Sequence, residues 1–120
     1  AFLGTTTGTT LVSDVDGTAP TSGAAVTIAD NEVVLLEDIA ANQDILTAAG
    51  LTTALTTGGE YEYYNMVAST QAIAVTFVDG VTTAAKVFYL ESDASAVITA
   101  TLVGTLTLTD AHSLHTDNFL

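Results

Sequence analysis

The stretch Ala96-Val-Ile-Thr-Ala-Thr-Leu-Val-Gly-Thr-Leu-Thr-Leu-Thr109 decides the fold class of this chain. Its apolar side chains share one parity: Ile98, Ala100, Leu102, Leu106 and Leu108. The other parity holds five threonines together with Val97 and Val103. Because side chains alternate faces along a β-strand, this period of two predicts a strand with one apolar face and one hydroxyl face. We expect the whole apolar face, Leu102 included, to be buried against a second layer.

Composition sets limits on the classes of protein to which the chain can belong. Of its 120 residues 48% are hydrophobic, which is enough for one domain, spanning residues 1–120, with a buried core. Fourteen acidic residues stand against a single basic residue, Lys86, and the net charge is −13. Phosphate contacts need Lys and Arg, so this balance argues against nucleic-acid binding and against docking on anionic membranes. An acidic surface fits solubility, divalent cations, a high-salt milieu or basic partners.

Further classes are excluded by residues that the sequence lacks. There is no cysteine, which excludes disulfides, thiol catalysis and cysteine-based zinc sites. No apolar run approaches the roughly 20 residues of a membrane span, so no membrane insertion is expected. The sequence begins with Ala1 and not with Met, which indicates a removed leader or a piece of a longer protein.

Most of the remaining segments are also predicted to be strands. Strands are expected at 5–12, 24–29, 33–36, 71–78, 82–90 and 96–109, and an Asp79-Gly80 turn helps to make the last three an antiparallel meander. One helix is predicted over 38–50, with Asp38 as its N-cap and Gly50 just past its C-terminal end. The predicted fold is all-β, an antiparallel β-sandwich or jelly-roll-like domain with one short helix.

The N-terminal segment, residues 1–12, is the candidate assembly strand. Two apolar side chains are followed by strand-prone residues, and the candidate assembly residues are Phe2, Leu3, Thr5, Thr7 and Leu11. Such a strand either pairs within its own domain or inserts into a neighbouring copy by strand addition, where main-chain hydrogen bonds supply affinity.

Two acidic pairs are candidate Ca²⁺ ligands. Asp14 and Asp16 occupy the first two acidic positions of a calcium loop, and Glu91 and Asp93 fall in a later turn. Hard cations need six to eight oxygen ligands, and the rest of the first loop supplies few carboxylates. A plain turn held by an Asp side chain is therefore the alternative for the first pair.

Other candidate chemistry is sparse. His112 and His115 are spaced three apart, which suits a metal site or a polar tail. Glu60 and Glu62 share one strand face, a geometry that fits glycoside hydrolysis. The tyrosines at positions 61, 63 and 64 either form a sugar-stacking platform or pack in the core. No nucleophile elbow or phosphate loop is present in the sequence, so we expect a protein that is not an enzyme, with a small hydrolase as the enzymatic alternative.

Three stretches of the C-terminal third form a recognisable series: Lys86-Val-Phe-Tyr-Leu-Glu-Ser-Asp93, Ala100-Thr-Leu-Val-Gly104 and Asp117-Asn-Phe-Leu120. They combine an aromatic strand, an acidic turn, a strand ending Leu-Xaa-Gly and an acidic, then apolar, terminus. This part of the chain resembles the C-terminal regions of RTX-type and S-layer-like proteins exported by type I secretion. The resemblance implies an extracellular bacterial setting and places a terminal export signal at residues 117–120.

Two functions from different classes follow from these observations. The first is a non-enzymatic, secreted structural protein that forms a homopolymer outside the cell or on its surface. Its form would be a filament, sheath or surface layer built by β-strand addition, with Ca²⁺ as the candidate cofactor. The alternative is a C-terminal export or adhesion module, including a carbohydrate-binding one, of a larger type I secreted protein.

Overall fold

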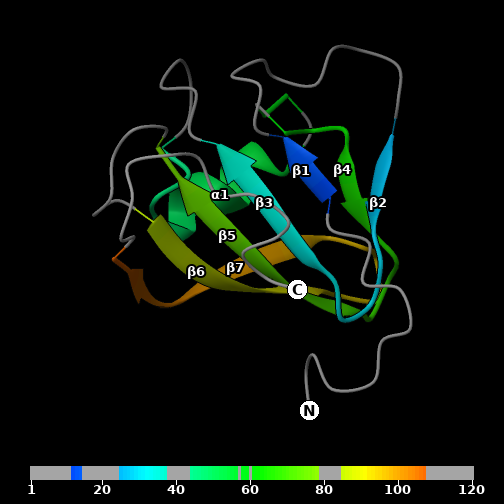
Figure 1. The fold of residues 1–120 in the computed structure, drawn as a ribbon. Coiled ribbons are helices and arrows are strands. Elements are labelled where there is room, and N and C mark those ends of the chain that lie inside the picture. Colours follow the sequence, from blue (N-terminus) through cyan, green and yellow to red (C-terminus); the bar gives the residue numbers. More distant parts are fainter. Residues whose placement is uncertain are drawn as a thin grey trace.

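The computed structural model of the protein describes residues 12–14, 25–37, 44–56, 58–59, 61–78 and 85–107. In these ranges the chain forms seven strands and one short helix (Figure 1). They are β1 (Val12–Asp14), β2 (Val26–Ile28), β3 (Val33–Glu37), α1 (Ala48–Ala54), β4 (Tyr64–Met66), β5 (Gln71–Phe77), β6 (Ala85–Ser92) and β7 (Ile98–Leu106). The protein is therefore all-β with one short helix, as the sequence predicts.

Five of the strands form one mixed sheet in the order β1-β3-β5-β6-β7. The first three run parallel to one another, whereas β5, β6 and β7 form the antiparallel meander predicted from the sequence. The other two strands, β2 and β4, pair in parallel as a separate two-stranded sheet, which lies to the right in Figure 1. The sequence did not predict these parallel pairs, and the described residues do not confirm a sandwich or a jelly roll.

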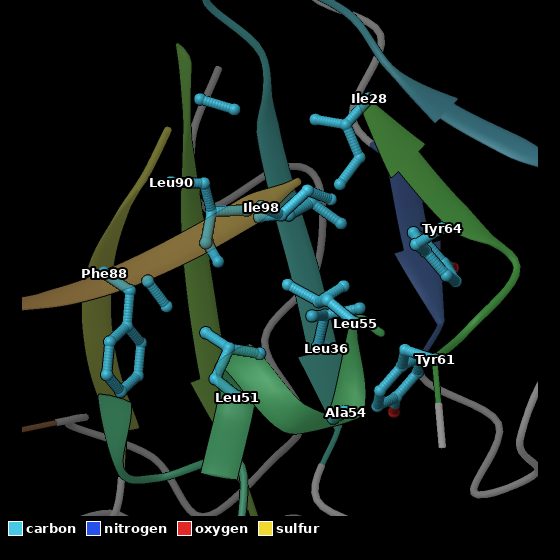
Figure 2. Packing of buried hydrophobic residues seen from close by; sticks show 14 of the residues in the cluster. Ile28, Leu36, Leu51, Ala54, Leu55, Tyr61, Tyr64, Phe88, Leu90 and Ile98 are labelled. Carbon is cyan, nitrogen blue, oxygen red and sulfur yellow. The ribbon is translucent and has the colours of Figure 1, made fainter. Parts of the chain in front are cut away.

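The main core lies between the α1 side of the large sheet and a layer made of α1, β2 and β4 (Figure 2). Leu51 of α1 is fully buried, as are Phe88 and Leu90 of β6 on the same side of the sheet. The smaller sheet contributes Ile28, also fully buried. Removing this apolar surface from water is the main stabilising term of such a fold, at about 25 cal/mol per Å².

Two of the three clustered tyrosines are part of this core. Tyr61 is fully buried and Tyr64 is 4% exposed, and their rings meet edge to face with centroids 5.5 Å apart. That geometry is one that aromatic pairs favour. The packing alternative is thus correct for Tyr61 and Tyr64, while Tyr63 between them is partly exposed.

The opposite face of the large sheet carries a second, smaller apolar cluster. Its buried members are Val33, Leu35, Val75, Phe77 and Ala85. Because β3 and β5 bury side chains on both faces, their sequences are nearly continuous apolar runs, which is typical of central parallel strands. This explains why the strand predicted at 33–36 shows no alternation of apolar and polar residues.

The helix is displaced from its predicted position. It begins after Thr47, whose hydroxyl accepts a hydrogen bond of 3.1 Å from the amide of Gly50, and it continues to Ala54. Residues 44–47 form turns because the Asp44 side chain accepts a bond from the amide of Leu46. Gly50 lies inside the helix and does not end it. Its missing Cβ is explained by a close approach, since a Cβ there would collide with the carbonyl of Asp44.

The prediction that β7 has one continuous apolar face is wrong. Val87 pairs with Gly104 but Phe88 pairs with Leu102, so Val103 is an extra residue in a β-bulge. Beyond the bulge the parity reverses, and Leu106 joins the cluster on the opposite face of the sheet. Leu102 stays on the α1 face but is 48% exposed, so the expectation that it is buried is also wrong.

Candidate functional site

The outer edge of β7 is the first candidate site. The strand is last in the order of the large sheet, and no other described strand pairs with its outer side. An edge strand presents a row of backbone N–H and C=O groups that can pair with another chain. The edge at the opposite end of the sheet is β1, which has only three residues against nine in β7.

The first part of this edge is covered by the helix. The backbone amide of Ala100 donates a hydrogen bond of 3.0 Å to the hydroxyl of Thr52 on α1. The Ala100 amide therefore points away from β6. Backbone groups alternate in direction along an antiparallel pair, so the N–H and C=O of Leu102 point outward as well. The open part of the edge is the second half of the strand, residues 101–106.

This open half of β7 has the side chains of a surface that binds another strand. Leu102 is 48% exposed and Val103 is 63% exposed. The strand sequence, ITATLVGTL, contains neither a charged residue nor a proline, the devices with which proteins usually protect an edge. A Cβ added at Gly104 would meet no described atom within 4 Å, which leaves room for a partner's backbone to approach closely.

Lys86 lies next to this open segment. It pairs with Thr105 in the β6–β7 register, and its ammonium donates a hydrogen bond of 2.9 Å to the Thr105 hydroxyl. Lys86 belongs to β6, the neighbour of the edge strand, but this hydrogen bond places its positive charge at β7. The sequence identified Lys86 as the sole basic residue but gave no signal that its ammonium reaches the edge.

The second candidate site is an open depression of about 490 Å³ at the end of the sheet where β6 leads into β7. Its lining is almost entirely polar and comprises Asp30, Ser69, Thr70, Gln71, Tyr89, Glu91, Ser92 and Asp93. The Tyr89 hydroxyl donates a hydrogen bond of 2.6 Å to the side-chain carbonyl of Gln71. The backbone amide of Gln71 donates one of 3.0 Å to the Asp30 carboxylate. Several of the lining groups are therefore hydrogen-bonded to one another.

Ser92 is a buried, hydrogen-bonded residue in the lining of the depression. It is 3% exposed, and its hydroxyl donates to the Val67 carbonyl at 2.6 Å while accepting from the Thr70 amide at 3.0 Å. These bonds fix the segment between β4 and β5 against the end of β6. Sequence reasoning missed Ser92, because a single serine in a turn-like stretch carries no signal of burial.

The structure places the predicted calcium residues as follows. Glu91 and Asp93 both line the depression and both are exposed. One oxygen of the Asp93 carboxylate accepts from the amides of Ser95 and Val97, at 2.7 and 3.0 Å, so that carboxylate already shapes the turn. Within the described ranges, no three Asp, Glu, His or Cys side chains are grouped to hold a metal ion. Calcium at this turn stays a prediction.

The other predicted residues are placed only in part. Asp14 is the last residue of β1, and its side chain is outside the described structure. The assembly residues Phe2 to Leu11, the second ligand Asp16 and both histidines lie outside the described residues. Glu62 is exposed, and its carboxylate accepts a 2.7 Å bond from the Gly58 amide, while its predicted partner Glu60 is not described.

Tyr63 has a raised pKa, and the Glu62 carboxylate contributes to it. Partial burial of the phenol, together with the charge and hydrogen bond of Glu62, raises the pKa of Tyr63 above its ordinary value of 10.0. The raised pKa keeps the Tyr63 phenol protonated at neutral pH.

Comparison with known proteins gives no family for the chain. No protein-family model, curated protein sequence or solved structure matches it. Across the described segments, no helix has the length and apolar character needed to cross a membrane. The described residues define an all-β protein with a mixed five-stranded sheet, in which no other described strand pairs with the outer side of the uncharged strand β7.

Proposed function

We propose that the protein is a non-enzymatic structural subunit of an extracellular filament, sheath or surface layer, assembled by β-strand addition. The observation that carries the proposal is the open half of β7. It combines outward backbone groups, the exposed side chains of Leu102 and Val103, and a strand without charge or proline. A strand added there would gain main-chain hydrogen bonds and cover apolar surface, which is how strand addition obtains affinity.

The point at which the N-terminal segment joins the sheet favours head-to-tail assembly of many copies and not a closed dimer. Residues 1–11 precede β1, which lies at the edge of the sheet opposite to β7. The proposed donor therefore joins the molecule at one edge, and the acceptor is the other edge. A contact between two different surfaces is head-to-tail, and it builds a fibre unless its rotation closes a ring.

Net charge also favours this pair of segments. Two copies that each carry −13 repel one another, so contact is least costly where neither surface is charged. The donor segment, AFLGTTTGTTL, carries no charged side chain, and neither does β7. The proposed interface thus joins two neutral strands of an otherwise acidic protein.

A charge placed on the acceptor edge tests the proposal. We expect Val103→Asp to prevent polymers, measured by sedimentation and electron microscopy, while the monomer keeps its melting temperature. The matched control is Val97→Asp, because Val97 is 54% exposed but precedes β7. Polymers formed by Val103→Asp at the wild-type concentration would contradict β7 as the acceptor.

Truncation tests the donor. Deleting residues 1–10 leaves β1 whole and should give monomers, and a synthetic peptide of residues 1–11 should then raise their melting temperature without restoring polymers. A truncated protein that still polymerises normally would show that the assembly depends on another surface.

One observation favours the alternative, an export or adhesion module of a larger secreted protein. The polar depression presents amide, hydroxyl and carboxylate groups beside Tyr89, which suits a polar ligand such as a carbohydrate. In that case the protein is a monomer at all concentrations, and binding on a glycan array is lost in Glu91→Gln but kept in Glu62→Gln, since Glu62 lies elsewhere.

A further inference from the structure

Lys86 is an unusual residue in this chain because it carries the single positive side chain against fourteen acidic ones. Its ammonium hydrogen-bonds to the Thr105 hydroxyl at 2.9 Å. In the part of the chain that the structure describes, no Asp or Glu forms an ion pair with it. The sole cation of a strongly acidic protein thus contacts a neutral group, although carboxylates are abundant.

The Lys86 side chain is directed toward the edge of the large sheet. Lys86 belongs to β6, and its bond to Thr105 carries the charge across to β7, the edge strand. Thr105 lies in the open half of β7, three residues after Leu102. A strand that pairs with this half runs alongside Thr105. The proposed donor, residues 1–11, carries no carboxylate, so the acidic partner of Lys86 has to come from residues of the neighbouring copy that flank the donor.

We infer that Lys86 binds a carboxylate of the neighbouring copy when β7 receives the added strand. The inference rests on the proposed assembly and identifies the electrostatic contact within it. A second copy is the occupant that charge favours, because each copy brings fourteen acidic residues, and a carboxylate of one copy beside the cation of the other lowers the repulsion between them. Charge complementarity of this kind fixes the register and the choice of partner more than it adds affinity.

Carbodiimide crosslinking tests the contact directly. The reagent joins an amine to a carboxylate that touches it, and Lys86 supplies the only side-chain amine of the chain. Polymers should be made from an equal mixture of ¹⁴N and ¹⁵N protein, crosslinked, and digested with chymotrypsin. We expect crosslinked peptides of mixed isotope composition that contain Lys86 in polymers, and none in the monomers made by deleting residues 1–10.

Variants test what the contact does. Lys86→Gln should raise the critical concentration for assembly about two- to fivefold, as expected for the loss of one exposed ion pair. Lys86→Arg keeps the charge, and its critical concentration should lie within about twofold of the wild-type value. Thr105→Val removes the bond that directs the ammonium and should have an intermediate effect. Monomer melting temperatures serve as the control for folding.

The outcomes separate this inference from the proposed function. Wild-type protein that stays monomeric at every concentration overturns both. Polymers in which Lys86 crosslinks only within its own chain, together with a Lys86→Gln critical concentration equal to that of wild type, overturn the Lys86 contact alone. A lower critical concentration for Lys86→Gln overturns it too, because Lys86 would then protect the edge against addition.

Discussion

Phe88 and Leu102 face each other across the β6–β7 pair, yet Phe88 is fully buried while Leu102 is 48% exposed. Both side chains lie on the α1 face of the sheet. The helix packs against β7, where the Thr52 hydroxyl accepts a hydrogen bond from the Ala100 amide, and its Leu51 lies in the same buried cluster as Phe88. The boundary between core and open edge therefore passes between two paired residues.

This boundary predicts a large difference between two truncations. Phe88→Ala should cost about 3–5 kcal/mol of unfolding free energy, because it leaves a cavity in the core. Leu102→Ala should cost about 1 kcal/mol, because half of its surface is already in water. Urea denaturation of dilute monomer measures both. Equal costs would show that Leu102 is covered in solution.

Thr76 offers a stabilising substitution. It is fully buried, and its hydroxyl has no hydrogen-bond partner among the described residues. Thr76→Val replaces this unpaired hydroxyl with a methyl group of similar size, and it should stabilise the fold by about 1 kcal/mol. Thermal and urea unfolding measure the change. Destabilisation would indicate that the hydroxyl is bonded in solution, for instance to a buried water molecule.

Ser92 should behave in the opposite way. Its hydroxyl bonds both the Val67 carbonyl and the Thr70 amide, so Ser92→Ala leaves these backbone groups without that partner. The expected cost is about 1–3 kcal/mol. Faster hydrogen exchange at the Thr70 amide would locate the effect. Unchanged stability and exchange would mean that water replaces the hydroxyl.

Tyr63 should titrate late. Partial burial and the Glu62 carboxylate raise its pKa above 10.0, so Tyr63 keeps its proton in the folded state where it would lose it in the unfolded chain. Its contribution to stability is therefore fully present below pH 10 and is lost as the pH rises through the raised pKa. Subtracting the 295 nm absorbance titration of Tyr63→Phe from that of wild type isolates this phenol. An ordinary midpoint in that difference would contradict the prediction.

Trypsin should report global or near-global opening. The chain has one site for the protease, after Lys86, and β6 is paired with β5 on one side and β7 on the other. Native protein should resist cleavage, and urea should release two fragments, 1–86 and 87–120, at a rate that follows the population of the open state. Mass spectrometry identifies the fragments. Rapid cleavage in native buffer would show that β6 opens by itself.

The sequence predicted those features of the fold that depend on neighbouring residues and missed those that depend on residues far apart in the chain. The meander was predictable because alternation in β5 and β6 and the turn residues between them are short-range signals. The parallel partners of β3 were not, since Val12 and Val75 are distant in sequence and leave no mark on the local pattern. The helix was misplaced because Gly50 reads as a stop signal, while its actual role is a close contact with Asp44.

The candidate sites were less predictable for the same reason. The β7 strand was recognised, but the bulge at Val103 reverses its parity, and a one-residue shift moves every later side chain to the other face. Glu91 and Asp93 both line the depression, but the prediction that they share one turn is wrong for Glu91, which belongs to strand β6 and pairs with Thr99, whereas Asp93 follows the strand. Asp30, in the turn between β2 and β3, and Gln71, at the start of β5, share that depression because the three-dimensional fold brings them together.

The mixed order of the large sheet also has a consequence for how the chain reaches its fold. Ser92 pairs with Ile98 across a short turn, whereas Leu35 must wait for Val75 before its strand gains its central neighbour. Closing such long loops is slow, and local hairpins form first. During synthesis the apolar β3 therefore emerges long before β5, and the arrival of β5, in the middle third of the chain, sets the moment at which β3 gains its central neighbour.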